Sequence, residues 1–594
     1  MKKRLIDFVD GYEQNSENML GKRFSSISYS GTVTHGRKQR ANRRMFRFFD
    51  DVWQRITYLT SKNYGAMSLS FGLVTIVLSF LKDYGSATGE EATLSFIIGI
   101  GFALLAIPLL LSDEPLSLLL QNIKLTDLIL FEFLRVNRAP NVENPKTVPT
   151  YLAVLFGVVT GLLGYVVPAF FIALGFVGLL FLILAFASPE FSVITTLTTL
   201  PIIAFTGYSG TIIAALVAVT FLSFARKVAV GKRVFIIEQY DLLLTALAFL
   251  IILSGIFNKG IDSFSDALVE VSAVIGCVLA SNIIIGRRLM DNAFIAISVS
   301  SIPVCAVSIG QLARGISTDG FLATLDRGIP SMFSNTGVLA IYLIAVIVVT
   351  ASMAKESSGR SSTLYVLLSV ISSLCLIMTG EAFAIFALLI GILARLSFKL
   401  GGFSVPILMM LLGLPYLLVL ISVFGDWIAY ASNSNMLSIL PGYWKICLSV
   451  LKNNLWFGIG VGEESFAEEM GGGALTDAQN LFLELGMEAG VLAVIVLALI
   501  FIVRIRHRLV YGRYMKNSDL RTASSALSCA MIAFMAFGAV DYIWSDPCIC
   551  LLFWCLFGFG SASLRASKQE HDDRVLYYED TRSHHSSAVD VEIA

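Results

Sequence analysis

The sequence predicts an all-α protein: a polytopic transmembrane helix bundle of about 14–16 spans with a long, partly helical extracytoplasmic loop. Of its 594 residues, 56% are hydrophobic and only 14% are charged, whereas a soluble domain carries about 25% charged residues. Apolar runs of about 20 residues, the length that a helix needs to cross a bilayer, recur along most of the chain. This composition excludes a soluble enzyme, a disordered chain and a fibre.

The expected spans follow one another from residue 65 to residue 564. Two of them, 192–206 and 209–225, are weak and could instead form a re-entrant hairpin together. Segment 114–134 is apolar but is interrupted by three charged residues, so we expect an interfacial helix there. The expected spans are 65–82, 94–112, 150–166, 168–187, 192–206, 209–225, 240–257, 264–285, 292–312, 335–353, 362–379, 381–398, 404–424, 490–506, 523–541 and 546–564.

The distribution of lysine and arginine predicts the orientation, because cytoplasmic loops retain these residues. The chain has 43 basic and 43 acidic residues, a balance that excludes a nucleic-acid binder judged from bulk charge. With both termini cytoplasmic and alternating spans, only six of the 43 basic residues face outward. These six are Lys82, Lys259, Arg314, Arg327, Lys445 and Lys452.

The spans divide the chain into regions. Basic and aromatic residues interleave at 37–58, which fits a segment on the anionic inner leaflet and equally an ordinary positive-inside flank. The two tails also suit binding to a cytoplasmic regulatory partner. We expect a cytoplasmic basic N-terminal arm at 1–63, accessory spans plus the interfacial helix at 64–149, a transmembrane core at 150–424, a large extracytoplasmic loop at 425–489, C-terminal spans at 490–564 and a cytoplasmic disordered tail at 565–594.

The outer face lacks the residues for several common chemistries. No Walker A motif and no GxGxxG in a βαβ context occur in the sequence, so we expect neither ATP-driven transport nor a bound cofactor. In this topology every histidine faces the cytoplasm, so we expect neither a histidine base nor a metal site outside. The five histidines are His35, His507, His571, His584 and His585.

Segment 313–340 carries two arginines, Arg314 and Arg327, immediately before a span. Arginine presents a planar fork of donors that matches the oxygens of a phosphate or diphosphate. A lipid-diphosphate headgroup would lie at this depth; alternatively, the arginines anchor to membrane phosphates or cap helix carbonyls. Asn335 stands at the start of the next span, where it is suited to cap that helix.

The long outer loop contains most of the remaining polar chemistry. Residues 443–451 have the spacing of an amphipathic helix, and the GIGVG tract that follows predicts a tight turn whose glycines let the backbone approach a ligand. The run of acidic residues after it is typical of a solvated face. Asp477 differs because it stands just before an apolar helix: it is either the cap of that helix or a carboxylate base at the membrane surface.

Three further carboxylates lie within or beside spans. Asp266 and Glu270 share one helix face at positions i and i+4, and Glu381 lies between two spans. Ionisable groups in a bilayer are functional candidates by default, although pairing with Arg314 or Arg327 would make them structural.

The order of these features resembles the O-antigen ligase and polysaccharide polymerase superfamily of bacterial membrane glycosyltransferases. Members of that superfamily have a long outer loop between late spans, in which a tract like W…nPlfGvGxgxF occurs. Here that tract runs from Trp444 through NNLWFGIGVGEESF and ends at Phe466. The resemblance covers roughly residues 150–564 and extends to the last span, DYIWSDPCICLLFWCLFGF.

Two other tracts of the superfamily have counterparts in this chain. One, like HxHNxyLqxxxexG, is matched by residues 477–484 and then by Glu488 and Gly490. The other, like RxxgxFxNpNxlAxyl, is matched from Arg327 to Tyr342. The order and spacing of the tracts, together with their expected side of the membrane, carry the resemblance.

The resemblance implies a surface polysaccharide polymerase or ligase in the bacterial plasma membrane. Such an enzyme transfers a glycan from an undecaprenyl-diphosphate carrier to a sugar hydroxyl, without a metal or cofactor. Its partners would be a lipid-linked oligosaccharide donor, a glycan or lipid acceptor and membrane lipids, with no nucleic acid. Cations must stabilise the leaving diphosphate. The candidates are Arg314, Arg327, Lys445 and Lys452.

The chain departs from the superfamily at the loop histidine, whose position holds Asp477 or Gln479, and at an SRG-like tract, where Glu381 replaces arginine. We therefore expect Asp477 to accept the acceptor's proton, with Gln479 or Asn480 orienting that acceptor. We expect the substrate cavity to include Asn335, Trp444, Glu463, Glu464 and Glu381.

Two other functions fit the same features. A flippase or transporter would move the lipid-linked glycan without chemistry, although the sequence shows no matching halves with broken central helices. A non-catalytic scaffold of polysaccharide assembly would fit the basic arm, the tyrosine-bearing tail and the missing loop histidine.

Overall fold

The structure, a computed structural model, describes a chain built almost entirely from helices. Its described residues contain a single isolated β-bridge, between Thr60 and Pro115, and eleven helices that are long and apolar enough to cross a membrane. The predicted all-α polytopic bundle is therefore confirmed. The described residues are 59–83, 89–136, 149–229, 233–258, 261–318, 320–400, 436–462, 465–467, 477–512 and 518–565.

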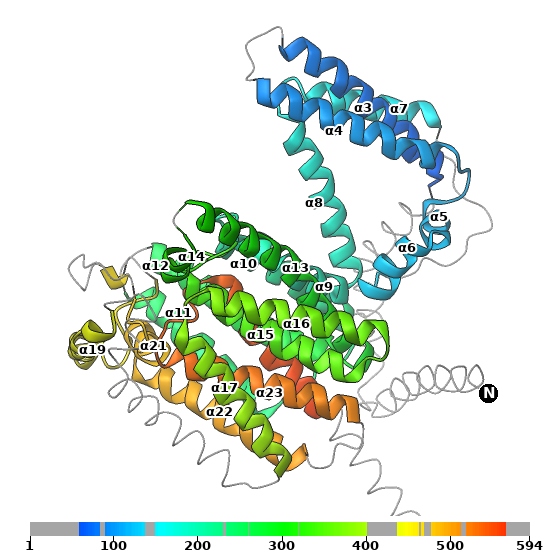
Figure 1. The fold of residues 1–594 in the computed structure, drawn as a ribbon. Coiled ribbons are helices and arrows are strands. Elements are labelled where there is room, and N and C mark those ends of the chain that lie inside the picture. The colour runs from blue at the N-terminus through cyan, green and yellow to red at the C-terminus, as the bar shows by residue number, and fades with distance from the viewer. Residues whose placement is uncertain are drawn as a thin grey trace, which may run out of the picture.

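Every expected span that falls on described residues coincides with a helix (Figure 1). The expected span at 404–424, most of the N-terminal arm and nearly all of the C-terminal tail lie outside the described residues. The span helices are α3 (Ser61–Asp83), α4 (Gly89–Leu110), α7 (Thr150–Leu163), α8 (Ala169–Ala187), α9 (Pro189–Ala204), α10 (Ser209–Ala229), α11 (Gln239–Phe257), α12 (Ile261–Ile283), α13 (Arg287–Thr318), α15 (Thr336–Glu356), α16 (Arg360–Met378), α17 (Ala382–Leu400), α22 (Val491–Tyr511), α23 (Ser518–Gly538) and the last helix, Pro547–Arg565.

The two weak spans differ from each other. Helix α10 has 21 residues and is long enough to cross a membrane, whereas α9 has 16 residues and most of them are buried. The segment expected as an interfacial helix at 114–134 is not one continuous α-helix, because Ile123 is extended and interrupts it and residues 127–133 form a π-helix. The pieces are α5 (Leu116–Asn122), α6 (Lys124–Thr126) and the π-helix η1 (Asp127–Phe133).

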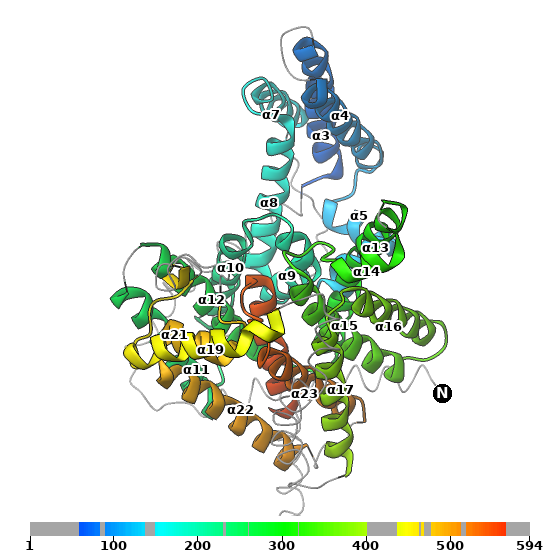
Figure 2. The same ribbon diagram turned by 60° about the vertical axis from the view of Figure 1, so that its left-hand side comes forward.

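Helix α15 forms the centre of the main bundle, where it packs against α13, α16 and α23 (Figures 1 and 2). Of its most apolar 18-residue window, 89% is buried. A helix that is hydrophobic on all sides belongs inside a bundle, so the sequence of α15 explains its position.

Helices α3, α4 and α7 form a smaller unit that stands apart from the main bundle and is joined to it along α8 (Figures 1 and 2). Glycines let these helices approach closely, as is common between helices in membranes. A Cβ atom at Gly72 would lie 2.7 Å from the carbonyl oxygen of Gly99, and one at Gly157 would lie 2.4 Å from that of Met67.

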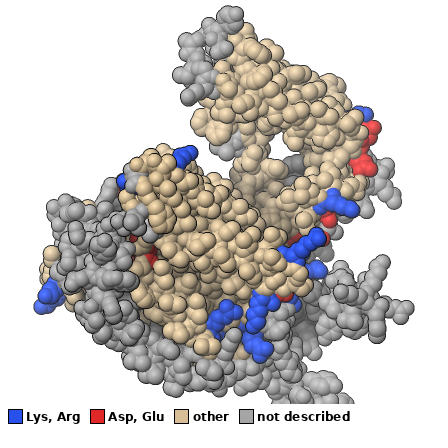
Figure 3. Space-filling model, viewed as in Figure 1, with Lys and Arg blue, Asp and Glu red and all other residues tan. Residues whose placement is uncertain are grey.

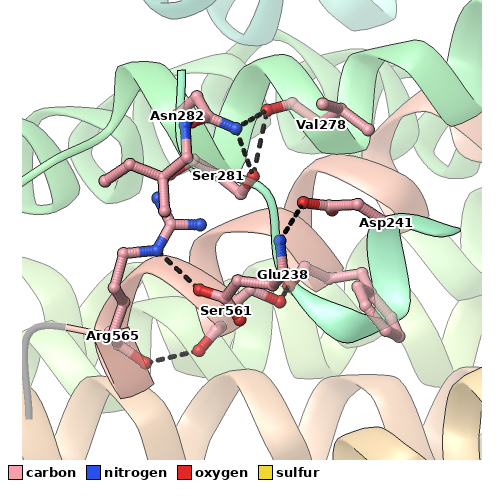
Figure 4. A network of polar contacts seen from close by, with 11 residues as sticks. Glu238, Asp241, Val278, Ser281, Asn282, Ser561 and Arg565 are labelled. Atoms are coloured by element: carbon pink, nitrogen blue, oxygen red, sulfur yellow. Dashed lines mark hydrogen bonds and ion pairs between the residues drawn. The ribbon is translucent and has the colours of Figure 1, made fainter. Parts of the chain in front are cut away.

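A polar network joins the last helix to the start of α11 and the end of α12 (Figure 4). Arg565 Nε donates to Glu238 Oε1 at 2.6 Å, and Arg565 Nη1 donates to the carbonyl oxygen of Ser281 at 3.4 Å. The backbone N–H of Glu238 donates to Asp241 Oδ2 at 2.7 Å, which completes a capping box at the start of α11. This network therefore fixes one end of α12.

Basic side chains are unevenly placed on the face seen in Figure 3. Most of them gather at one end of the main bundle, around the ends of α16 and α23 and beside α5 and α6. The broad middle of this face shows neither basic nor acidic side chains, as is expected of a surface in contact with lipid.

Candidate functional site

A cavity of about 440 Å³ lies at the end of α12 opposite to the network of Figure 4. Its walls come from the first turns of α12, from α21 (Leu481–Ala489) and from the segment before the last helix. Tyr542 and Trp544 contribute aromatic surface, and no lysine, arginine or histidine lines the cavity among the described residues. We call it the acidic cavity because its lining includes Asp262, Asp266, Glu270, Asp477, Glu484 and Glu488.

Helical spacing explains why five of these carboxylates face one space. Asp262, Asp266 and Glu270 follow one another at intervals of four residues on α12, and Glu484 and Glu488 do so on α21. Residues four apart lie on the same helix face. The two acidic faces meet across the cavity, so Asp266 and Glu270 belong to a larger cluster of carboxylates.

The GIGVG tract is a tight turn, as the sequence predicts. Gly458, Gly460 and Gly462 have φ values of +68°, +109° and +102°, which side chains rarely adopt. A Cβ atom at Gly462 would lie 2.1 Å from Asp266 Oδ2. The backbone N–H of Val461 donates to Ser263 Oγ at 2.9 Å, so the turn is fastened to α12 beside the acidic cavity.

Asp477 lines the acidic cavity and does not cap α21. Its Oδ1 accepts hydrogen bonds of 2.8 Å from both the backbone and the side-chain nitrogen of Gln479. Asn480 is the cap: its Oδ1 accepts from Phe482 N and Leu483 N, and its Nδ2 donates to the carbonyl oxygen of Ala539 at 2.8 Å. Gln479 therefore positions Asp477, and Asn480 positions the helix.

Trp444 contacts the segment that carries Asp477. It lies on α19 (Met436–Asn453), an amphipathic helix that packs against α21, and its Nε1 donates to the carbonyl oxygen of Ala478 at 3.0 Å. The next backbone group, Ala478 N, donates to Glu484 Oε2 at 2.5 Å. The amphipathic helix expected at 443–451 is thus present and supports the wall that carries Asp477.

Tyr542 joins the two acidic helices. Its hydroxyl oxygen lies 3.0 Å from Glu270 Oε1 and 3.1 Å from Glu488 Oε2. Glu488 is only 3% exposed and also accepts from the backbone N–H of Gly462 at 3.3 Å. Burial, and then repulsion from Glu270 and Glu484, raises the pKa of Glu488 well above its usual range.

A second acidic group adjoins the acidic cavity beside the start of α15. Burial, followed by repulsion from Glu381 and Asp477, raises the pKa of Asp541 to about 8. Glu381 accepts a hydrogen bond of 2.7 Å from Thr336 Oγ1. Asn335 caps α15 by accepting from Val338 N at 2.8 Å, which confirms the predicted cap.

The four cations expected to bind diphosphate do not line the acidic cavity. Arg314 lies in the last turns of α13, and Arg327 ends α14 (Phe321–Arg327). Lys445 and Lys452 lie on α19, and all four side chains are exposed. Glu463 and Glu464 lie outside the described residues.

Sequence reasoning did not single out Tyr542, Trp544 or Asp541, which lie in the connection between α23 and the last helix. From the sequence, their tract, DYIWSDP, is recognised only as part of the final span. Its signal was the pair of acids in a stretch rich in aromatic residues between two apolar runs. Among the described residues, no group of histidine, cysteine and carboxylate side chains is arranged to hold a metal ion.

Comparison with models of known protein families finds no match, and a search of curated proteins finds no match either.

Proposed function

We propose that this chain transfers a glycan from an undecaprenyl-diphosphate carrier to a sugar hydroxyl that binds in the acidic cavity, on the outer face of the bacterial plasma membrane. The observation that carries the proposal is the lining of the cavity: six carboxylates, two aromatic side chains and no basic one among the described residues. The product would be a polymerised or ligated surface polysaccharide.

This lining suits an acceptor sugar better than a diphosphate. Carboxylates accept hydrogen bonds from sugar hydroxyls, and aromatic faces cover the apolar faces of sugar rings. The same carboxylates repel the phosphates of the carrier. The diphosphate would therefore lie outside the acidic cavity, and the exposed Arg314 and Arg327 remain our candidates for binding it.

The transfer needs a group that takes the acceptor's proton. An ionised carboxylate of the acidic cavity accepts the hydroxyl proton as the hydroxyl oxygen bonds to the anomeric carbon. The bond from that carbon to the carrier breaks, and its electron pair leaves with the diphosphate. Asp477 is our candidate because it lines the cavity and is held in place by two hydrogen bonds from Gln479.

The placement of charge supports an outward-facing cavity. The acidic cavity and the network of Figure 4 lie at opposite ends of α12. Segment 226–239, which runs from the last turn of α10 to the start of α11, has four basic residues, which favours the cytoplasmic side for that end. The acidic cavity would then open on the opposite face.

An Asp477→Asn substitution tests the proposal in cells. Asparagine keeps the shape of the side chain but accepts no proton at neutral pH, so we expect the amount of polymerised or ligated glycan to fall at least about 100-fold. Asp113→Asn, an exposed change near α5, is the matched control and should leave the product unchanged. Wild-type product length and amount from Asp477→Asn would remove Asp477 from the mechanism.

One observation favours a flippase as the second candidate. Glu270 and Glu488 are ionisable groups that meet inside a helix bundle, an arrangement that also suits a proton-coupled carrier. Purified protein in liposomes with a lipid-diphosphate glycan separates the functions. Longer glycan or released carrier diphosphate indicates an enzyme, movement of the lipid alone indicates a flippase, and neither result indicates a scaffold.

A further inference from the structure

Two carboxyl groups meet at one phenol on the wall of the acidic cavity. Tyr542 Oη lies 3.0 Å from Glu270 Oε1, and 3.3 Å and 3.1 Å from the two carboxyl oxygens of Glu488. A phenol carries one proton and can donate it to only one acceptor at a time. The contacts to both carboxyl groups are hydrogen bonds only if one carboxyl carries a proton and donates it to Tyr542.

Among the described residues that line the acidic cavity, no cation compensates the charge of this pair. The other oxygen of Glu270, Oε2, is buried and accepts no hydrogen bond from a described residue. A buried carboxylate oxygen without a donor or a cation is costly, because nothing replaces its lost hydration. A proton on one carboxyl group removes that charge. Burial and the need for a second hydrogen-bond donor at Tyr542 therefore both favour a pair in which one carboxyl group is protonated.

Among the described residues, the titratable groups around the pair are carboxyl groups and one thiol. Asp262 and Asp266 lie on α12, and Glu484 lies on α21. Asp477 precedes α21, and the thiol of Cys550 lies on the last helix. Each negative neighbour makes full ionisation of the pair less favourable, and the described lining of the cavity supplies no positive group against it.

We propose that Glu270, Tyr542 and Glu488 form a proton-binding site on the wall of the acidic cavity, in which two carboxyl groups share one exchangeable proton through the phenol. Burial and the nearby acids raise the pKa of Tyr542 well above its ordinary value, so the phenol stays a donor. Glu488 Oε1 also accepts a hydrogen bond from Gly462 N, which helps to hold this carboxyl beside the phenol. The site does not depend on whether the chain transfers or moves a glycan.

The site predicts how folding stability depends on pH. The pKa of Glu488 is raised in the folded chain, so as pH rises the folded state keeps its proton longer than a glutamate in the unfolded chain, whose pKa is about 4.3. The stability from this site is therefore complete below about pH 4 and is lost as pH rises through the folded pKa.

Thermal unfolding of the purified full-length chain in detergent, followed from acid to alkaline pH, tests the proposal. The measured quantity is the number of protons released on unfolding, which follows from the pH dependence of stability. We expect unfolding of the wild type to release on the order of one proton more than unfolding of Glu270→Gln or Glu488→Gln. The double variant should match the single variants, because either substitution removes the shared proton.

The matched control is Asp262→Asn, which removes one negative charge from the same cavity wall without touching the pair. Wild-type pH dependence in both single glutamine variants would overturn the proposal. So would an equal loss of pH dependence in Asp262→Asn, because general charge repulsion would then explain the effect. If Glu488→Gln does not fold, Glu270→Gln alone tests the proposal. In that variant, we expect the infrared band of protonated carboxyl groups, recorded on the folded protein at neutral pH, to be weaker than in the wild type. These outcomes need no substrate, so they are separate from the fate of glycan transfer.

Discussion

Single glycines decide how closely the acidic elements approach each other. Gly462 brings the turn against α12 with a backbone conformation that suits only glycine, and its position leaves no room for a Cβ atom beside Asp266. The tight turn was predictable from the GIGVG tract. Its partner was not, because sequence spacing does not show which distant helix a turn will touch.

We expect Gly462→Ala to destabilise the protein by roughly 1–3 kcal/mol, because alanine would be strained at a φ of +102° and would contact Asp266. Chemical denaturation monitors the change. Gly178→Ala is the control: Gly178 lies in α8 with open space around its Cβ position, so alanine should be neutral or slightly stabilising. Equal stability of Gly462→Ala and wild type would contradict this account of the turn.

Asp541 should give the protein a measurable pH response near pH 8. Its pKa is raised from about 4 in the unfolded chain to about 8 in the folded one, so the folded state binds its proton more tightly. The resulting stability is complete below about pH 4 and disappears as pH rises through 8. The melting temperature of the wild type should therefore fall as pH rises from 6 to 9, and that of Asp541→Asn should fall less. An equal fall in the two proteins would show that another group titrates in this range.

At the scale of elements, a buried ion cluster holds the short helix α9 in place. Glu190, 6% exposed, accepts from Lys227 on α10 at 3.0 Å and pairs with Arg233 beyond the end of α10. The sequence shows α9 as a weak span but does not show this cluster, because its members are separated by about 40 residues. The cluster explains how α9, shorter than its neighbours, keeps a fixed position among them.

Glu190→Gln should therefore cost roughly 3 kcal/mol of stability, because it leaves Lys227 buried without its negative partner. The measurement is the shift of the denaturation midpoint. The matched comparison is Asp113→Asn, which breaks an exposed pair with Lys62 and should cost about 0–1 kcal/mol. Similar shifts in the two variants would mean that the α9 cluster contributes little.

At the scale of the whole molecule, the expected topology places the end of α13 outside and the α15–α16 connection inside. Ser317→Cys and Ser358→Cys, both at exposed positions, test this. A membrane-impermeant thiol reagent should label Ser317→Cys in intact cells and should label Ser358→Cys only after the membrane is opened. The eight native cysteines are all buried, which keeps the background low. Labelling of Ser358→Cys in intact cells would reverse the orientation.

The sequence by itself determined the fold class, the order of the helices and several local features. Spans can be predicted because a bilayer demands about 20 apolar residues whatever the neighbours are. The cap at Asn335, the glycine turn and the amphipathic helix at α19 depend on residues close together in the chain, so their patterns are visible. The same reasoning does not show the break at Ile123.

Only the tertiary structure decided which polar residues share a site. Glu270, Glu488 and Tyr542 belong to segments as much as 272 residues apart, and packing between those segments brings their oxygens together. Tertiary contacts also hold the side chain of Asn480 against Ala539 and place Asp477 on the cavity wall. Hydropathy depends on each residue alone, whereas a site depends on which helix faces meet, and that is set by how the whole bundle packs.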